Sequence, residues 1–301
     1  MVETIIKIFC DLHDISKIIE NICNGNFLGL DDEENEKKVK QKSRMHISEI
    51  ATILIYFHLS GYRNFKKYYK EKVETDLKCF FPNLVSYNRF LEIKPSAFYL
   101  ISLYLLHDGL GKCSGLSFID STFIDVCHCR RIYSHKVFES LAARGKGSTG
   151  WHYGFKLHLV TNDRGEIISF HVTPGNVDDR NIDVIDKLTE NIFGKLIADK
   201  GYISAKLSEH LLSKSIKIIT KIKKNMKNKL MEMEDKILLR KRSIIECVND
   251  FLKNICQIEH SRHRSVHNFI MNIISAIAAY SYLEKKPSLD FNKNCDKPVV
   301  I

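Results

Sequence analysis

Three carboxylates stand out because of where they fall along the chain. Asp120 and Asp199 each follow a short apolar run that is typical of a strand, and Glu246 lies inside a helical pattern. Carboxylates at the carboxyl edge of a sheet, facing a carboxylate on a helix, can together bind hard divalent cations. Because no His or Cys belongs to the set, Mg²⁺ or Mn²⁺ is favoured over Zn²⁺. Two such ions support in-line phosphoryl displacement.

The third carboxylate belongs to an amphipathic stretch. At 3.6 residues per turn, one face is apolar and consists of Ile244, Ile245, Val248, Leu252 and Ile255. The opposite face carries Arg242, Glu246, Asn249 and Lys253. The pattern predicts a helix that buries one side and presents a carboxylate flanked by two cations. A plain surface helix with an Arg–Glu pair four residues apart is the alternative.

Composition limits the class of protein. The 301 residues are 44% hydrophobic and 27% charged, which is typical of a globular protein, and the net charge of +10 favours a polyanionic partner such as nucleic acid. The odd count of 9 Cys without a visible secretory signal predicts free thiols in a reducing cytoplasm. The longest apolar stretch, 269–283, is too short and too polar to span a membrane.

Residues 1–110 are expected to form a helical, basic region that binds DNA. Apolar residues recur there every three or four positions, and the segment 62–70 mixes aromatic with basic side chains. Lys66 and Lys67 are the candidates for phosphate contacts, with the aromatic residues packing behind them. The alternative is a core helix with a basic outer face.

Near Gly109 the pattern of apolar residues changes from helical spacing to short runs that are typical of strands. Residues 111–290 are expected to form an α/β (α+β) domain, followed by a tail, 291–301. Two alternating strands flank the turn 162–165, which predicts a hairpin. The strand 216–220 leads into a basic loop, 221–229, whose candidate DNA contacts are Lys221, Lys223 and Lys224.

Three features compete with this assignment or remain outside it. Asp178 and Asp179 rival Asp199 as the second acid, although capping of the following helix is the favoured role. The group Cys127-His128-Cys129 with His135 suggests zinc only weakly, because its spacing is Cys-x-Cys rather than Cys-x2-Cys. Trp151, the only Trp, is expected to pack in a core, with stacking on an unpaired base as the alternative.

The chain resembles the DDE transposases of bacterial insertion sequences. Their signature Tyr-x2-Arg-x3-Glu-x6-Lys is matched by Arg242, Glu246 and Lys253, whereas Leu239 stands in place of the Tyr. The motifs Ile119-Asp120-Ser121 and Asp199-Lys-Gly201-Tyr202 look like those of the first and second acids. Further segments, including 58–62, 81–89, 175–180, 220–225 and 258–264, resemble insertion-sequence family 982, and the likeness extends to Leu289.

This resemblance implies a ribonuclease-H-like catalytic core in which Asp120, Asp199 and Glu246 bind two Mg²⁺ ions, with Mn²⁺ as a substitute. Arg242 and Lys253 would contact phosphates. The implied activity is cleavage at terminal inverted repeats and strand transfer into target DNA by a homodimer in the cytoplasm, associated with the nucleoid. A repurposed DNA-binding protein and a purely hydrolytic endonuclease are the alternatives.

Overall fold

The computed structural model describes residues 2–22, 44–147, 150–221, 231–259 and 263–289. The chain divides into two compact units. One comprises Met1–Gly109 and Leu252–Tyr282, and the other comprises Leu110–Phe251 and Leu283–Ile301. None of the helices in the described ranges combines the length and the apolar character that a membrane span requires.

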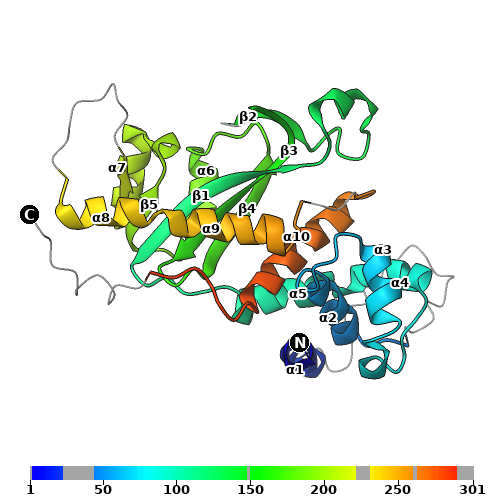
Figure 1. Cartoon of the computed structure of the whole chain (residues 1–301). Helices are drawn as coiled ribbons and strands as arrows, with labels where there is room; N and C mark the ends of the chain where they lie inside the picture. Colours follow the sequence, from blue (N-terminus) through cyan, green and yellow to red (C-terminus); the bar gives the residue numbers. More distant parts are fainter. Residues whose placement is uncertain (1, 23–43, 148–149, 222–230, 260–262, 290–301) are drawn as a thin grey trace, which may run out of the picture. The chain divides into compact units, whose positions relative to one another are not determined.

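The first unit is helical throughout its described residues (Figure 1). Its α-helices are α1 (Val2–Ile22), α2 (Ile47–Phe57), α3 (Phe65–Tyr68), α4 (Tyr87–Ile93), α5 (Ala97–Tyr104) and α10 (Val266–Ser281). Most of α2 and α10 is buried, because both are apolar on nearly every side and pack on α5. The helical N-terminal region expected from the apolar periodicity is confirmed.

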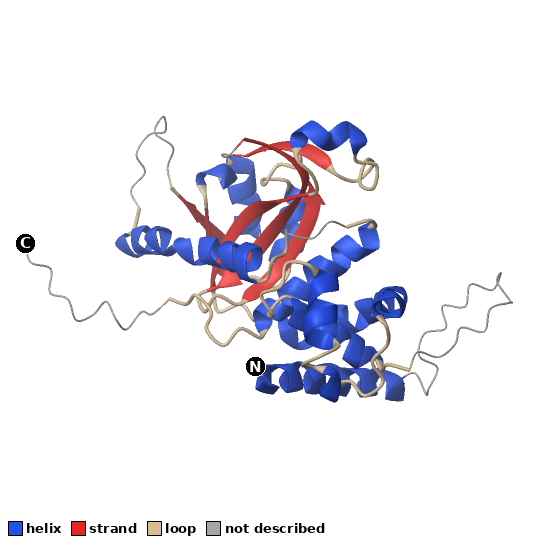
Figure 2. Ribbon diagram, turned by 45° about the vertical axis from the view of Figure 1, so that its right-hand side comes forward, coloured by secondary structure: helices blue, strands red, loops and turns tan. Residues whose placement is uncertain are grey.

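The second unit contains the sheet (Figure 2). Its strands are β1 (Leu116–Asp125), β2 (Ala143–Gly147), β3 (Gly150–Asn162), β4 (Ile167–Pro174), β5 (Gly194–Ala198) and β6 (Ile216–Thr220). Its α-helices are α6 (Ile182–Thr189), α7 (Ala205–Ser213), α8 (Met233–Lys241) and α9 (Ser243–Asp250). The predicted hairpin is present between β3 and β4, and Gly165 adopts the positive φ of 71° that its turn requires.

The strand order β4-β3-β1-β5-β6 defines the fold of this unit. β1 pairs antiparallel with β3, and β3 with β4, whereas β5 pairs parallel with β1 on one side and with β6 on the other. β2 pairs with the first residues of β3. Three antiparallel strands followed by two parallel ones, with helices on both faces, form a ribonuclease-H-like sheet. The expected α/β class with a ribonuclease-H-like core is therefore confirmed.

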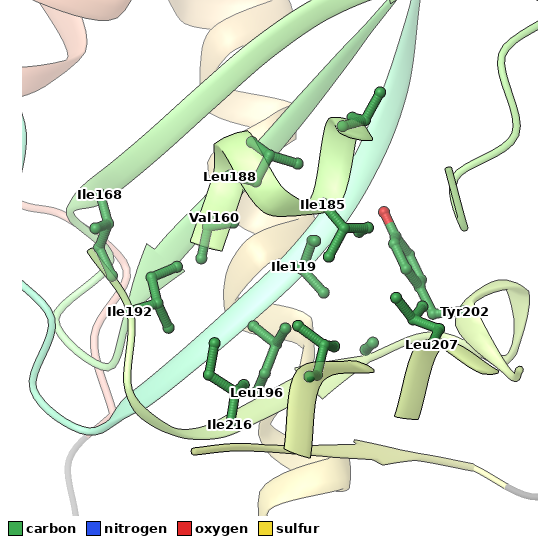
Figure 3. Close-up of a cluster of buried hydrophobic side chains, with 13 residues drawn as sticks. Ile119, Val160, Ile168, Ile185, Leu188, Ile192, Leu196, Tyr202, Leu207 and Ile216 are labelled. Carbon is green, nitrogen blue, oxygen red and sulfur yellow. The ribbon is translucent and has the colours of Figure 1, made fainter. Parts of the chain in front are cut away.

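The two faces of the sheet are covered by different helices. On one face α6 and α7 pack over a cluster that contains Ile119, Val160, Leu196 and Ile216 (Figure 3). On the other face α9 contacts β1, and α8 contacts β5 and β6. Because successive side chains of a strand point to opposite faces, Ile119 enters the α6–α7 core and Asp120 points toward α9.

Candidate active site

Asp120 and Asp199 are brought together by strand register. β1 and β5 are parallel partners with Phe118 opposite Ile197. Two residues further along each chain, the same register aligns Asp120 with Asp199. Asp199 directly follows the end of β5, as the sequence predicts. Asp120 lies in the middle of β1, because β1 continues to Asp125 through its pairing with β3; the expectation that it ends a strand is wrong.

Helix α9 supplies the third carboxylate. Ile244, Ile245 and Val248 are buried against the sheet, which leaves the Glu246 side chain 52% exposed. The Arg242 guanidinium donates a hydrogen bond to Glu246 and lies 4.0 Å from Asp120 Oδ1. Arg242 therefore spans the carboxylates of β1 and α9. The Arg–Glu pair of the surface-helix alternative is present, but on the face that looks onto Asp120.

Asn249 is a residue of this site to which the sequence gives no role. Its Nδ2 donates to Asp120 Oδ2 at 3.1 Å, so it holds the carboxylate from α9. Its Oδ1 is buried and has no hydrogen-bond partner among the described residues. The available signal is its position three residues after Glu246 on the polar face of the helix. An amide there both orients Asp120 and leaves one oxygen acceptor free.

The Asp120 carboxyl has an unusual proton affinity. Burial raises its pKa from 3.8 to about 6. The Arg242 guanidinium opposes this shift, whereas the negative charges of Asp199 and Glu246 add to it. Asp199 and Glu246 thus each lie close enough to Asp120 for their charges to oppose its ionisation, and a cation bound beside Asp120 would relieve that opposition.

The burial of this charge, with a smaller effect from the two neighbouring carboxylates, predicts that Asp120→Asn stabilises the metal-free protein at pH 7.5. The folded pKa exceeds the unfolded value, so the contribution of Asp120 to stability falls as the pH rises from about 4 through about 6. Asparagine carries no charge, so we expect a gain of about 3 kcal/mol at pH 7.5, about half of that at pH 5 and almost none at pH 3.5. Urea unfolding in EDTA measures all three. A variant less stable than wild type at pH 7.5 alone would refute the electrostatic account.

The carboxylate set fits a hard divalent cation by its chemistry. All three side chains offer oxygen ligands, Asp120 is partly buried, and the Asn249 amide that donates to it has an unpartnered Oδ1. Within the described part of the chain, no group of three or more His, Cys, Asp or Glu side chains is close enough to hold a metal ion as it stands. Arg242 pairs with Glu246 in this arrangement, so metal binding would require the pair to separate.

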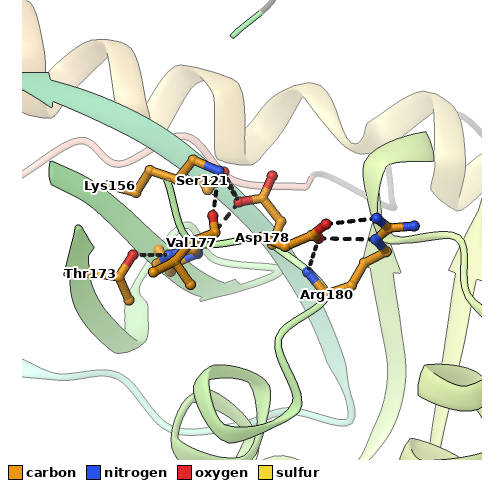
Figure 4. A network of polar contacts seen from close by, with 8 residues as sticks. Ser121, Lys156, Thr173, Val177, Asp178 and Arg180 are labelled. Carbon is orange, nitrogen blue, oxygen red and sulfur yellow. Dashed lines mark hydrogen bonds and ion pairs between the residues drawn. The ribbon is translucent and has the colours of Figure 1, made fainter. Parts of the chain in front are cut away.

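Asp178 and Asp179 do not cap α6, so that expectation is wrong. Asn181 is the N-cap, and its Oδ1 accepts the amides of Asp183 and Val184. Asp178 instead accepts two hydrogen bonds from the Arg180 guanidinium, which lower its pKa to about 2 (Figure 4). The residues 178–181 form a tight turn before the helix, and Asn181, which has an extended backbone, directly precedes the first helical residue.

Asp179 belongs to a network behind the first acid. Its Oδ1 accepts hydrogen bonds from Ser121 Oγ at 2.9 Å and from Lys156 Nζ at 3.0 Å. Lys156 also donates to the Val177 carbonyl, and His158 donates or accepts at Thr173 Oγ1 (Figure 4). Ser121 follows Asp120 directly, so this network holds the backbone of β1 from the face opposite the Asp120 side chain.

The candidate DNA contacts fall in different places. Lys66 and Lys67 are exposed on α3 with Tyr68 buried behind them, so the basic outer face and the aromatic core coexist. Lys221 is exposed directly after β6, and Lys223 and Lys224 lie outside the described residues. Lys253 belongs to the helical unit, where its Nζ pairs with Glu259 at 3.3 Å.

The signature helix is not continuous. α8 ends at Lys241, α9 spans Ser243–Asp250, and a π-helical turn, Phe251–Ile255, follows. Ile255 is 42% exposed, so the apolar stripe expected to reach it ends at Leu252. Leu239, at the position of the motif Tyr, is buried on α8. The Leu239 side chain fills this buried position as an apolar residue and provides no phenol hydroxyl.

The residues around Cys127 make local contacts. His128 Nδ1 accepts the backbone amide of Arg130, and Cys129 donates to the Trp151 carbonyl. Trp151 itself is 53% exposed, so the expectation that it packs in a core is wrong. The short strand β2 pairs beside it and offers no second layer of side chains.

The match to a family model agrees with the geometry of the site. The family model described as a transposase DDE domain matches residues 110–266, which include all three carboxylates. No curated protein matches the chain. A cryo-EM structure of a piggyBac transposase synaptic complex with hairpin DNA is similar over 92% of this chain and 72% of that one, with 10% identity and a TM-score of 0.49.

Proposed function

The chain belongs to the family of transposase DDE domains, and on this premise we propose that it mobilises a bacterial insertion sequence of family 982. It binds the terminal inverted repeats, cleaves DNA there and transfers the freed strand to target DNA. The observation that supports this most is the register of β1 and β5, which aligns Asp120 with Asp199 beneath the helix that carries Glu246. Matched spacing at 242, 246 and 253 supports the family assignment.

Transposase DDE domains use divalent metal ions. Asp120, Asp199 and Glu246 would hold two Mg²⁺ ions, for which Mn²⁺ would substitute. When bound, such ions stabilise the attacking and leaving oxygens of a phosphoryl displacement.

The remaining residues position this set. Asn249 holds Asp120 by a hydrogen bond, and Arg242 neutralises Glu246 before substrate arrives. The guanidinium is also suited to a phosphate, because its planar fork matches two oxygens. The chain thereby supplies orientation and charge, and no covalent enzyme intermediate is needed.

Strand-specific mapping tests the proposal. Labelled terminal-repeat DNA is incubated with the protein and Mg²⁺, nicks are mapped, and joining to a target plasmid is assayed in parallel. We expect nicks at the repeat end and joined products. Cleavage without joining would indicate a hydrolytic endonuclease. Binding without cleavage would indicate a repurposed DNA-binding protein, and a homodimer holding two ends would appear as a paired-end complex.

Binding to terminal-repeat DNA should weaken steeply with salt. The net charge is +10, and Lys66, Lys67 and Lys221 are exposed. If about six phosphates are neutralised, the affinity should fall on the order of 10³-fold between 50 and 200 mM salt. Fluorescence anisotropy in EDTA measures this slope. A flat dependence would exclude an electrostatic DNA interface.

Lys253→Ala tests the last cation of the signature. To contact a phosphate, Lys253 must leave its ion pair with Glu259. Losing the phosphate contact should weaken the binding of cleaved DNA ends by about 1.5 kcal/mol, roughly tenfold. Single-turnover cleavage should slow in parallel. Glu259→Gln is the matched control, because it breaks the same ion pair and keeps the cation. Equal losses in both variants would assign Lys253 a structural role.

A further inference from the structure

The β2–β3 ribbon presents the only Trp of the chain to solvent. Trp151 lies opposite Lys146 in the register of the two strands and is 53% exposed. A large aromatic side chain on a two-stranded ribbon gains little from burial there. Its exposure leaves the indole ring accessible to a ligand, and the side chains beside the ring suggest what that ligand is.

Two cations lie against this ring. The Arg144 guanidinium carbon is 4.4 Å from the ring centroid, and Lys146 Nζ is 5.8 Å from it. Both residues are exposed, and neither forms a salt bridge with any carboxylate in the described ranges. An aromatic face with unneutralised cations beside it is the combination that binds single-stranded nucleic acid, through base stacking and phosphate attraction.

The same cations line an open pocket of about 380 Å³. Its polar walls include Arg144, Lys146, Lys156, Asp178, Asp179 and Arg180. The acids are already engaged, since Asp178 pairs with Arg180 and Asp179 with Lys156. The pocket extends to Gly201, two residues after Asp199, and Asp179 bonds Ser121 beside Asp120. It therefore lies on the face of the sheet opposite the Asp120 side chain and reaches the segment that follows Asp199.

We propose that this ribbon and pocket bind an unpaired nucleotide of the DNA, with its base on Trp151 and its phosphates beside Arg144 and Lys146. The inference rests on the proposed function in taking DNA as the ligand. Single-stranded DNA is favoured over duplex because a paired base offers no free face to the indole. In this proposal the β2–β3 ribbon binds the DNA, and the three carboxylates bind the metal ions.

Fluorescence of the single Trp provides a direct test. The full-length protein is titrated with a short oligodeoxythymidine, and separately with a blunt duplex of mixed sequence, in EDTA so that no cleavage occurs. We expect the single strand to quench Trp151 emission strongly and in a salt-dependent manner, and the duplex to quench it weakly. Equal quenching by both, or none by the single strand, would overturn the proposal.

Variants locate the contact by anisotropy of a labelled oligodeoxythymidine. Trp151→Ala should weaken binding roughly tenfold and Trp151→Phe less, because every aromatic face supports stacking. Arg144→Gln with Lys146→Gln should weaken it similarly, whereas Lys206→Gln, an exposed control on α7, should not. Thermal unfolding checks that each variant is folded. Unchanged affinity in Trp151→Ala would overturn the proposal.

The nick-mapping experiment keeps this inference separate from the proposed function. Single-strand binding through Trp151 in a protein that never nicks terminal-repeat DNA would refute the function and retain the inference. If the protein nicks terminal-repeat DNA normally but Trp151→Ala leaves its affinity for single-stranded DNA unchanged, the inference is refuted and the proposed function is retained.

Discussion

Asp120→Asn, Asp199→Asn and Glu246→Gln should each reduce DNA cleavage at least about 10³-fold, because preorganised charge at the reacting phosphate is usually the largest catalytic contribution. Each change removes one negative charge and nearly preserves shape. The charges of Asp199, at the end of β5, and of Glu246, on α9, both act on Asp120 in β1, so losing any one of the three charges should weaken cation binding. Single-turnover cleavage of terminal-repeat DNA measures the effect.

Binding of the same DNA should survive in all three variants, since none of them removes a cation. Asp178→Asn is the matched control, because Asp178 is an exposed aspartate engaged by Arg180. It should retain cleavage within a few-fold. Full cleavage by Asp199→Asn together with loss in Asp178→Asn or Asp179→Asn would move the second acid to the turn before α6.

The parts of this site that follow from sequence are those set by local periodicity. The stripe Ile244, Ile245 and Val248 determines which side of α9 is buried, and so places Glu246 and Arg242 on the other side. The apolar run before Asp199 ends at a real strand end. In both cases the deciding interactions lie within a few residues along the chain, where amphipathic pattern is informative.

The remaining features depend on long-range pairing. Asp120 lies inside β1 because β3, some forty residues later in sequence, continues to pair with it through Asp125. Asn181 rather than Asp178 caps α6 because the helix begins at Ile182, after a turn in which Arg180 binds Asp178. The exposure of Trp151 follows from the short β2, which single-sequence periodicity does not reveal. The residues 252–282 belong to the same unit as the N-terminal helices, although about 140 residues of the other unit lie between them in the sequence. No local pattern in the sequence indicates this.

Lys156→Met should destabilise the protein by about 2–3 kcal/mol, because it leaves the Asp179 carboxylate without its cation. The Lys156 side chain is only 11% exposed, and its Nζ donates to both Asp179 and the Val177 carbonyl. Methionine fills much the same volume as lysine, so the expected loss of stability comes from the missing charge and not from a new cavity. Asp179 would keep its bond from Ser121, with His158 Nδ1 3.9 Å away.

The double variant Lys156→Met with Asp179→Asn separates this account from simple loss of packing. Removing both charges eliminates the uncompensated carboxylate, so most of the stability should return. Urea unfolding at pH 7.5 gives the free energies, and Lys206→Met, on an exposed position of α7, should change stability by only a few tenths of a kcal/mol. Equal destabilisation in the single and double variants would mean that the Lys156 stem, and not its charge, holds β3 against the turn before α6. In that case the network behind Asp120 would be a packing contact, and Asp179→Asn alone would leave both stability and cleavage unchanged.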